Sequence, residues 1–146
     1  AWRNGWFHTG DLFYCDDEGY YYYVDRNKDT IRRRGENISS FEVEEEVRKF
    51  PDVLEVACVA ASSDLGEDEV KVFVVPREGA QLNPAELIRF LIPRMPHHMV
   101  PRYVEIIDEM PKTPTTRVKK HVLRERGNSP STWDRETAGI KVSRAT

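Results

Sequence analysis

Three short segments carry residues whose types and spacing could bind a phosphorylated ligand. In the first, Asp11 follows Gly10 at the start of an expected strand. A carboxylate placed there can accept hydrogen bonds from both hydroxyls of a ribose. The alternative is a turn aspartate that bonds its own backbone, and the residues of this segment alone favour that alternative.

The second segment, residues 25–39, has charges of both signs followed by a glycine loop that opens a helix. The third, residues 110–120, is a loop of threonines and prolines that presents basic side chains. Both patterns suit contact with an anion, because helix N-termini and cationic side chains attract negative charge. The alternatives are a solvated linker with a helix cap and an exposed basic loop.

The composition is that of a folded domain. The 146 residues include 22 Lys and Arg against 25 Asp and Glu, a formal net charge of −3. Nucleic-acid binders usually have a basic excess, so we expect no nucleic-acid partner. No apolar run approaches the ~20 residues of a transmembrane segment. Cys15 and Cys58 lie far apart and lack partners at metal-ligand spacing, which predicts no metal site, no disulfide and a cytoplasmic location.

Turn and capping signals predict the order of the elements. Strand formers around an acidic turn indicate a β-hairpin over residues 12–24. Ser39 and Glu42 form a capping box for a helix that ends at Pro51, and Asn83 caps a second helix. Further strands are expected at 53–61, 70–75 and 103–107, and a short basic helix at 118–126. The fold class is therefore α+β, a small mixed β-sheet flanked by helices and preceded by a β-hairpin.

The same signals divide the chain into three parts. Residues 1–27 are the hairpin end of a different unit, residues 28–126 are the α+β domain, and residues 127–146 are a loosely attached polar tail. Tyr20 to Tyr23 are expected to pack within the hairpin, and His97 and His98 to form a loop pair. The run Arg32 to Arg34 is expected at a solvated strand edge or against CoA phosphates.

The order and spacing of the three motifs resemble those of the adenylate-forming ligases, which include acyl-CoA synthetases, peptide-synthetase adenylation domains and luciferases. The resemblance covers residues 4 to about 124. Within the family, residues 34–39 are most similar to the carnitine/crotonobetaine-type CoA ligases. The motifs are Gly5-Trp6-Phe7-His8-Thr9-Gly10-Asp11, the block from Asp25 to Glu44 with its Arg26, Asp29, Ile31, Gly35 and Ile38, and the Pro-Lys-Thr-x-Thr loop at 111–115.

The resemblance implies roles for single residues. Asp11 matches the carboxylate that holds the ribose hydroxyls of ATP and of the acyl-adenylate, and Arg26 matches a residue that contacts the nucleotide. Lys28 falls at the hinge between a large N-terminal domain and a mobile C-terminal domain. Gly35 matches a loop that lines the pantetheine tunnel. Asn37 falls where the family often has Gln or Arg near the α-phosphate.

The C-terminal loop departs from the family pattern. It usually ends in Thr-Gly-Lys, and that lysine bridges the carboxylate and the phosphate during adenylation, whereas this chain has Thr115-Thr116-Arg117. Arg117 keeps the charge, but a planar guanidinium is not interchangeable with an ammonium. We expect Arg117 to take the catalytic role. The alternatives are that Lys119 or Lys120 reaches in, or that adenylation is impaired.

The implied function is that of the C-terminal part of an ATP-dependent acid–CoA ligase. Such an enzyme activates a carboxylic acid as acyl-adenylate and transfers it to CoA, with release of pyrophosphate and AMP. Mg²⁺, the ATP phosphates and the acyl pocket belong mainly to the N-terminal domain, so this fragment alone is expected to be inactive. The alternatives are an adenylation domain that acts on carrier-protein pantetheine and a non-catalytic binding module.

Overall fold

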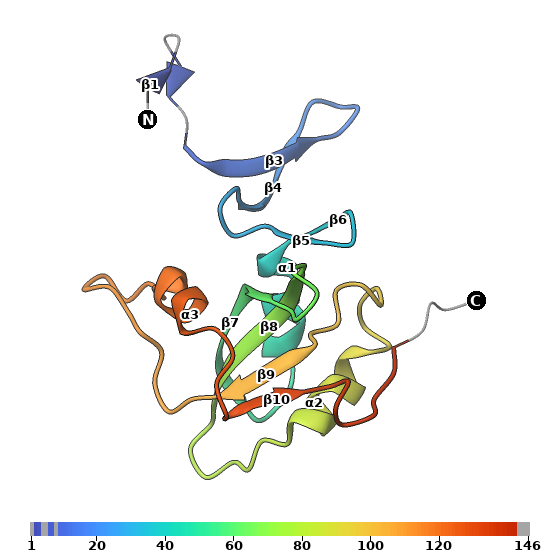
Figure 1. Cartoon of the computed structure of the whole chain (residues 1–146). Helices are drawn as coiled ribbons and strands as arrows, with labels where there is room; N and C mark the ends of the chain where they lie inside the picture. The colour runs from blue at the N-terminus through green and yellow to red at the C-terminus, as the bar shows by residue number, and fades with distance from the viewer. Residues whose placement is uncertain (1, 4–5, 8, 143–146) are drawn as a thin grey trace.

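The computed structural model describes residues 2–3, 6–7 and 9–142, which form small β-hairpins followed by an α+β domain (Figure 1). Gly5 and His8 of the first motif lie outside the described residues. The hairpin strands are β1 (Trp2–Arg3), β2 (Trp6–Phe7), β3 (Asp11–Cys15), β4 (Tyr21–Arg26), β5 (Ile31–Arg33) and β6 (Glu36–Ile38). The domain continues with α1 (Ser40–Arg48), β7 (Val53–Ser62), β8 (Asp68–Pro76), α2 (Pro84–Leu91), β9 (Tyr103–Ile106), α3 (Lys120–Arg126) and β10 (Thr132–Asp134).

The largest sheet has the strand order β10-β9-β8-β7, with β8 and β9 parallel and the other pairs antiparallel. Successive side chains of a strand point to opposite faces, so β7 and β8 supply two separate cores. Val72 packs on one face with α1 and α2, while Phe73 packs on the other with Leu123 of α3. This arrangement confirms the predicted small mixed sheet flanked by helices.

Both predicted helix starts are present. The Ser39 hydroxyl accepts a hydrogen bond from the backbone N–H of Glu42, and the Asn83 side chain accepts one from the N–H of Ala85. Each cap satisfies a backbone donor that has no partner within its helix. The capping residues therefore fix where α1 and α2 begin, as the sequence predicts.

No helix among the described residues is long and apolar enough to cross a bilayer.

The β3–β4 hairpin stands away from the mixed sheet (Figure 1). Its aromatic side chains pack across the strands: Phe13 meets Tyr23 edge-on at 5.6 Å between ring centroids, and Tyr14 stacks on Tyr22 at 4.9 Å. They nevertheless remain exposed, and Tyr21 keeps 74% of its surface open to solvent. The aromatic packing thus consists of these cross-strand pairs and one contact with the domain, in which Tyr23 meets Phe41 of α1 edge-on at 5.8 Å between ring centroids.

The β5–β6 hairpin was not predicted. Its two-residue turn consists of Arg34 and Gly35, with φ angles of 49° and 82°. Positive φ at both central residues is the signature of a type I′ turn, whose twist suits a tight hairpin. Arg33 is buried rather than at a solvated edge, and its guanidinium Nε lies 2.6 Å from the Glu69 carboxylate.

The expectation of a loosely attached tail is wrong for residues 128–142. Strand β10 extends the mixed sheet beside β9, and Trp133 and Ile140 pack against the core. The buried amine of Lys71 donates to the Thr132 hydroxyl at 3.0 Å and to the Glu105 carboxylate at 2.7 Å. Strand β10 therefore lies over a buried polar cluster and supplies one of its hydrogen-bond acceptors, the Thr132 hydroxyl.

Candidate active site

Asp11 and Arg26 are cross-strand neighbours at the domain end of the β3–β4 hairpin. The Arg26 Nε lies 3.6 Å from Asp11 Oδ1, and both side chains remain partly open to solvent. The backbone N–H of Asp11 donates to the Thr9 hydroxyl at 3.2 Å. Among the described residues, no backbone N–H donates to the Asp11 carboxylate, so the carboxylate is not occupied by a turn of its own backbone. It is available to accept hydroxyl donors from a ligand.

A small hollow of about 260 Å³ opens beside this pair and extends to the next turn of the chain. Two of its lining segments are joined by a hydrogen bond of 2.8 Å from the Asn27 N–H to the Gly10 carbonyl. The hollow brings Arg26 and Lys28 together within a few residues of Asp11. It is lined by Thr9, Gly10, Arg26, Asn27 and Lys28.

Lys28 lies in an exposed turn that is held firmly on both sides. On one side, Asp25 is 3% exposed and accepts hydrogen bonds from the N–H and hydroxyl of Ser40 at 2.7 and 2.8 Å. On the other side, the Asp29 carboxylate accepts from Arg124 of α3 at 2.9 Å. The turn that contains Lys28 therefore lies between two side-chain anchors, Asp25 and Asp29.

The Asp25–Ser40 contact continues into a buried polar network. The Lys120 amine donates to the Ser40 hydroxyl at 2.9 Å and pairs with Glu44 at 2.7 Å. Glu44 also accepts the backbone N–H of Cys58, whose thiol pKa is raised above its ordinary value by burial and then by the Glu44 charge. The Lys120 amine therefore already has two partners within the domain, Ser40 and Glu44.

The loop that carries Arg117 is a tight turn. An isolated bridge joins Lys112 to Val118, and the Thr113 N–H donates to the Arg117 carbonyl at 2.8 Å. Thr116 has a φ of 65°, the left-handed region that glycine adopts without strain. The left-handed backbone explains why the family pattern has a glycine at this position. In this chain the loop adopts the same backbone conformation with Thr116 in place of the glycine. The Arg117 side chain is exposed.

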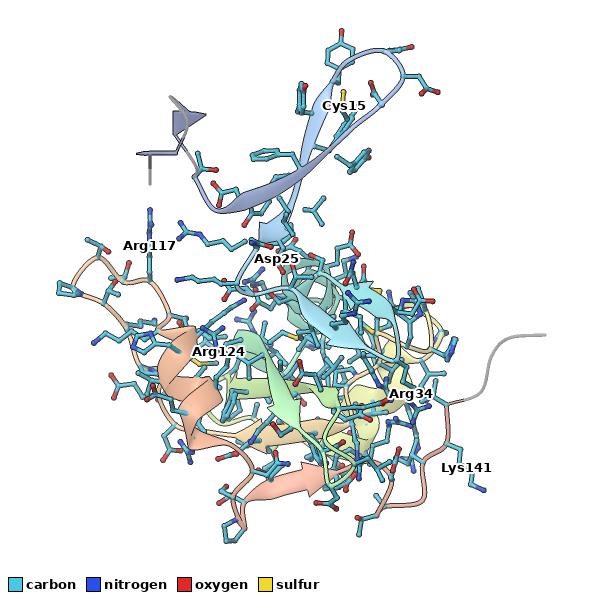
Figure 2. All side chains as sticks on the ribbon, turned by 45° about the horizontal axis from the view of Figure 1, so that its top comes forward. Cys15, Asp25, Arg34, Arg117, Arg124 and Lys141 are labelled. Atoms are coloured by element: carbon cyan, nitrogen blue, oxygen red, sulfur yellow. The ribbon has the colours of Figure 1, made fainter. Side chains whose placement is uncertain are left out.

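Gly35 and Asn37 lie on a different loop from Arg117. Gly35 occupies the exposed tip of the β5–β6 hairpin, with no atom within 4 Å of the place where a Cβ would stand. Asn37 pairs with Arg32 across the hairpin and is exposed. In Figure 2, Arg34 at the hairpin tip and Arg117 lie on opposite sides of the domain, with Asp25 between them.

The structure therefore brings Asp11, Arg26 and Lys28 together and separates Arg117 from Gly35 and Asn37. Sequence reasoning missed Asp25 and Ser40, which position the turn. The predicted hairpin stops at residue 24, whereas β4 continues through the buried Asp25 to Arg26. The capping pattern at α1 was a signal that could have identified this contact, because a helix N-terminus attracts a carboxylate such as that of Asp25.

The comparison with known families decides where the chain belongs. Residues 42–117 match the family model described as the AMP-binding enzyme C-terminal domain. The chain belongs to this family. The matched region begins in α1 and ends at Arg117, so it includes strands β7, β8 and β9 of the mixed sheet and the loop with the expected catalytic side chain.

Curated relatives of this AMP-binding C-terminal domain are CoA ligases. The chain is 38% identical over 109 residues to the crotonobetaine/carnitine–CoA ligase of Escherichia coli O8 (strain IAI1), covering 75% of the chain and 21% of that enzyme. It is 39% identical over 134 residues to the peroxisomal trans-cinnamate:CoA ligase of Petunia hybrida, covering 92% and 24%. The chain thus spans a quarter or less of the length of these two relatives.

Solved structures show the same domain fold. ATP-bound MatB from Rhodopseudomonas palustris has a TM-score of 0.75 and 31% identity, covering 82% of this chain and 24% of that one. The o-succinylbenzoate CoA synthetase (MenE) of Bacillus subtilis, in complex with its acyl-adenylate intermediate, has a TM-score of 0.79 and 26% identity, covering 90% and 26%. The predicted family and fold class are confirmed.

The described part of the chain offers no group of three or more His, Cys, Asp or Glu side chains that could hold a metal ion. These residues therefore do not fit a Mg²⁺ site. Asp11 does fit a ribose, because its carboxylate is a partly exposed acceptor beside a cationic side chain.

Proposed function

We propose that this chain is the mobile C-terminal domain of an ATP-dependent acid–CoA ligase, joined to the last hairpin of the N-terminal domain. Membership of the AMP-binding C-terminal domain family and the CoA ligases among its relatives support this function. The proposed boundary lies at Lys28, within the turn between the bonds of Asp25 and Asp29. The domain then includes residues 28–142, because β10 belongs to its sheet.

One observation supports the proposal more than any other: Arg117 and the Gly35 hairpin lie on opposite sides of one domain (Figure 2). Two such surfaces cannot face the same bound substrate at the same time. A rotation about Lys28 would present them in turn, which suits an enzyme that catalyses two successive reactions in one site.

In the first reaction, a carboxylate oxygen of the acid attacks the α-phosphorus of ATP. The new P–O bond forms as the bond to pyrophosphate breaks, and pyrophosphate leaves with the bonding electron pair. Asp11 would orient the nucleotide by accepting the ribose hydroxyls, with Arg26 beside it. The Arg117 guanidinium would lie between the carboxylate and the α-phosphate, where it stabilises the developing negative charge. Mg²⁺, held elsewhere in the complete enzyme, would supply further charge neutralisation on the phosphates.

In the second reaction, the thiolate of CoA attacks the carbonyl carbon of the acyl-adenylate. The thioester bond forms and AMP departs with the electron pair of the broken C–O bond. The Gly35 hairpin would line the path of the thiol arm, and the missing side chain at its tip leaves that path open. Asn37, exposed on the same hairpin, would contact the phosphate of AMP as it leaves.

The test is a screen of the full-length protein against a panel of carboxylic acids. We expect pyrophosphate release that depends on both ATP and one class of acid, together with consumption of free CoA. Consumption of a carrier-protein pantetheine, with free CoA ignored, would instead identify a carrier-dependent adenylation domain. Absence of pyrophosphate release with every acid, from folded protein, would indicate a non-catalytic module and contradict the proposal.

The cytoplasmic location stays a prediction, and the Petunia relative is named as peroxisomal.

A further inference from the structure

Strand β4 touches the start of α1 through three neighbouring pairs of residues. The pairs, together called the β4–α1 contact, are Val24 with Ser39, Asp25 with Ser40, and Tyr23 with Phe41. The Ser39 hydroxyl donates to the Val24 carbonyl at 2.8 Å, and the rings of Tyr23 and Phe41 meet edge-on. Between residues 9–27 and residues 31–142, the structure has no other hydrogen bond, ion pair or aromatic contact.

The pair of Asp25 and Ser40 is the strongest part of the β4–α1 contact. Asp25 is almost completely buried and Ser40 is completely buried, and both Ser40 donors bond to the same carboxylate oxygen, Oδ2. Hydrogen bonds to a charged group are stronger than those between neutral groups. The Lys120 amine donates to the Ser40 hydroxyl at 2.9 Å, so the hydroxyl proton remains for Asp25. This pair therefore opposes any movement that separates β4 from α1.

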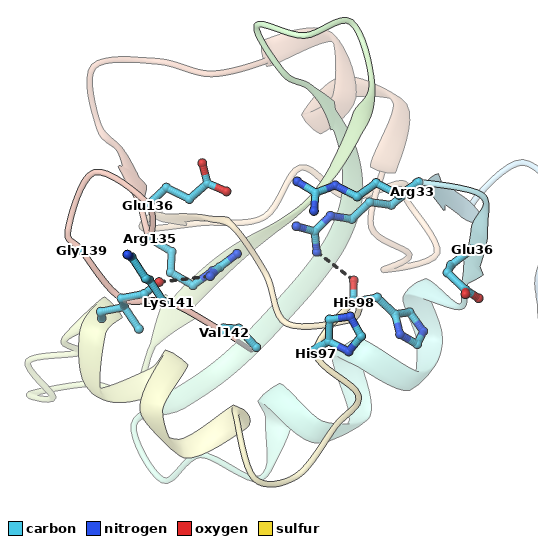
Figure 3. A pocket seen from close by; sticks show the side chains of 11 residues that line it. Arg33, Glu36, His97, His98, Arg135, Glu136, Gly139, Lys141 and Val142 are labelled. Atoms are coloured by element: carbon cyan, nitrogen blue, oxygen red, sulfur yellow. Dashed lines mark hydrogen bonds between the residues drawn. The ribbon is translucent and has the colours of Figure 1, made fainter. Parts of the chain in front are cut away.

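The segment that follows the turn at Lys28 is attached to the domain. Arg33 of β5 donates to the His98 carbonyl at 2.9 Å, the bond that Figure 3 draws between these two residues, and it pairs with Glu69 of β8. Asp29 is held by Arg124 of α3. The chain after the turn thus belongs to the domain, and the β4–α1 contact joins the hairpin to the domain across the turn.

A rotation about Lys28 must break the β4–α1 contact, because β4 lies before the turn and α1 lies after it. The three pairs can therefore form in only one orientation of the domain. In the orientation of this structure, the Arg117 side chain points toward the end of the molecule that carries the β3–β4 hairpin (Figure 2). Asp11, which the proposed function assigns to the nucleotide, lies on that hairpin.

We propose that Ser40 is a positioning residue, which acts through Asp25 to hold the domain in the orientation for the first reaction and releases it for the second. The assignment to a reaction rests on the proposed function, whereas the contact itself does not. Opening returns the Asp25 carboxylate and the Ser40 donors to water, which replaces the lost bonds in part. The contact thus biases the orientation without making the rotation irreversible.

Ser40→Pro removes both donors to Asp25 without removing a hydrogen bond of the helix. Ser40 is the first residue of α1, a position that proline favours because its N–H has no partner within the helix. Proline requires an extended backbone before it, and Ser39 has φ −75° and ψ 118°. Phe41→Ala removes the aromatic pair alone. Ser62→Ala, at the exposed end of β7, is the matched control.

The test is the distance between two nitroxide labels on the 146-residue chain, measured by double electron–electron resonance. Cys15 in the hairpin is exposed and Cys58 is buried, so one label attaches to the native Cys15 and the other to Arg89→Cys on α2. The parent chain should show one main distance. Ser40→Pro should add a second distance and raise the ratio of displaced to contacting molecules about 100-fold, tenfold for each lost bond. Phe41→Ala should raise that ratio about threefold.

Thermal melts establish that each variant is folded. An unchanged distance in folded Ser40→Pro would overturn the proposal, as would the same second distance in Ser62→Ala. Should Ser40→Pro fail to fold, Phe41→Ala decides the matter, because an unchanged ratio in that variant also counts against the contact.

The two half-reactions of the full-length protein test the link to catalysis. Ser40→Pro should slow pyrophosphate–ATP exchange about tenfold, because fewer molecules hold the required orientation, while thioester formation from supplied acyl-adenylate is unchanged or faster. A merely structural role would slow both, so equal slowing would overturn the positioning role. Absence of exchange in the parent protein would contradict the proposed function, and the label distances would still decide the contact.

Discussion

Asp25 at the end of β4 accepts hydrogen bonds from both the backbone N–H and the hydroxyl of Ser40, at 2.7 and 2.8 Å. This contact joins the hairpin to the first residue of α1, where the helix dipole favours a negative charge. A third bond, 2.7 Å from the Arg26 N–H, uses the other carboxylate oxygen. One buried side chain thus sets the position from which the turn at Lys28 begins.

Replacing Asp25 with alanine should destabilise the domain. The change leaves buried donors of Ser40 without acceptors, at a cost of about 2–4 kcal/mol in the free energy of unfolding. Asp25→Asn, which keeps one acceptor oxygen, should cost less. Urea denaturation measures both, with Asp17→Ala in the exposed hairpin turn as the control, expected within about 0.5 kcal/mol of the parent chain. Equal midpoints for Asp25→Ala and the control would remove Asp25 from its assigned role.

The sequence predicted those parts of the fold that depend on local signals. Ser39 and Asn83 cap their helices because a hydroxyl or amide oxygen next to a free N–H is sufficient. The β5–β6 hairpin escaped prediction because its turn depends on Arg34 at positive φ, which non-glycine residues seldom adopt. Strand β10 was not predicted because it contains Thr132, a polar residue that accepts a hydrogen bond from the buried amine of Lys71. The position of Lys71 in the sequence gives no indication that it is buried.

The buried pair of Lys71 and Glu105 should make stability depend on pH. Burial alone would raise the pKa of Glu105, but hydrogen bonds from Lys71 and Thr132 outweigh it and hold that pKa below its ordinary value. The folded state therefore binds this proton more weakly than the unfolded state. The stabilisation is complete above the unfolded pKa and is lost as the pH falls through the lowered folded value.

Urea midpoints recorded from pH 7 down to pH 3 measure this dependence. The parent chain should lose stability more steeply on acidification than Glu105→Gln. At pH 7, Lys71→Met should cost less than the about 3–5 kcal/mol of an isolated buried charge, because Arg126 still lies 2.8 Å from the Glu105 carboxylate. Parallel pH profiles for the parent chain and Glu105→Gln would contradict the account.

The loop at Arg117 should gain stability from a glycine. Thr116 holds a φ of 65°, and a β-branched residue pays about 1–2 kcal/mol for a left-handed backbone. Thr116→Gly removes this strain and should raise the free energy of unfolding by up to about 1 kcal/mol, after the greater freedom of glycine in the unfolded chain is deducted. Thr115→Gly, at a position without positive φ, should lower it. Destabilisation by both changes would show that Thr116 is not strained.

The candidate site could be predicted only in part. Asp11 and Arg26 meet because the hairpin register makes them partners, and the hairpin was predictable from its strand formers. The separation of Arg117 from Gly35 could not be predicted, because it depends on how two loops from distant parts of the sequence leave a common sheet. Asp25 was missed because its partner Ser40 lies 15 residues further on.

The central claim is that one domain serves two reactions with opposite faces, and the two half-reactions measured separately in the full-length enzyme test it most directly. Arg117→Ala should slow pyrophosphate–ATP exchange by about 10²–10³, while thioester formation from supplied acyl-adenylate stays within a few-fold. Gly35→Asn keeps the positive φ of the turn but adds a side chain, so it should slow thioester formation and spare the exchange. Equal slowing of both half-reactions by each variant would contradict the account.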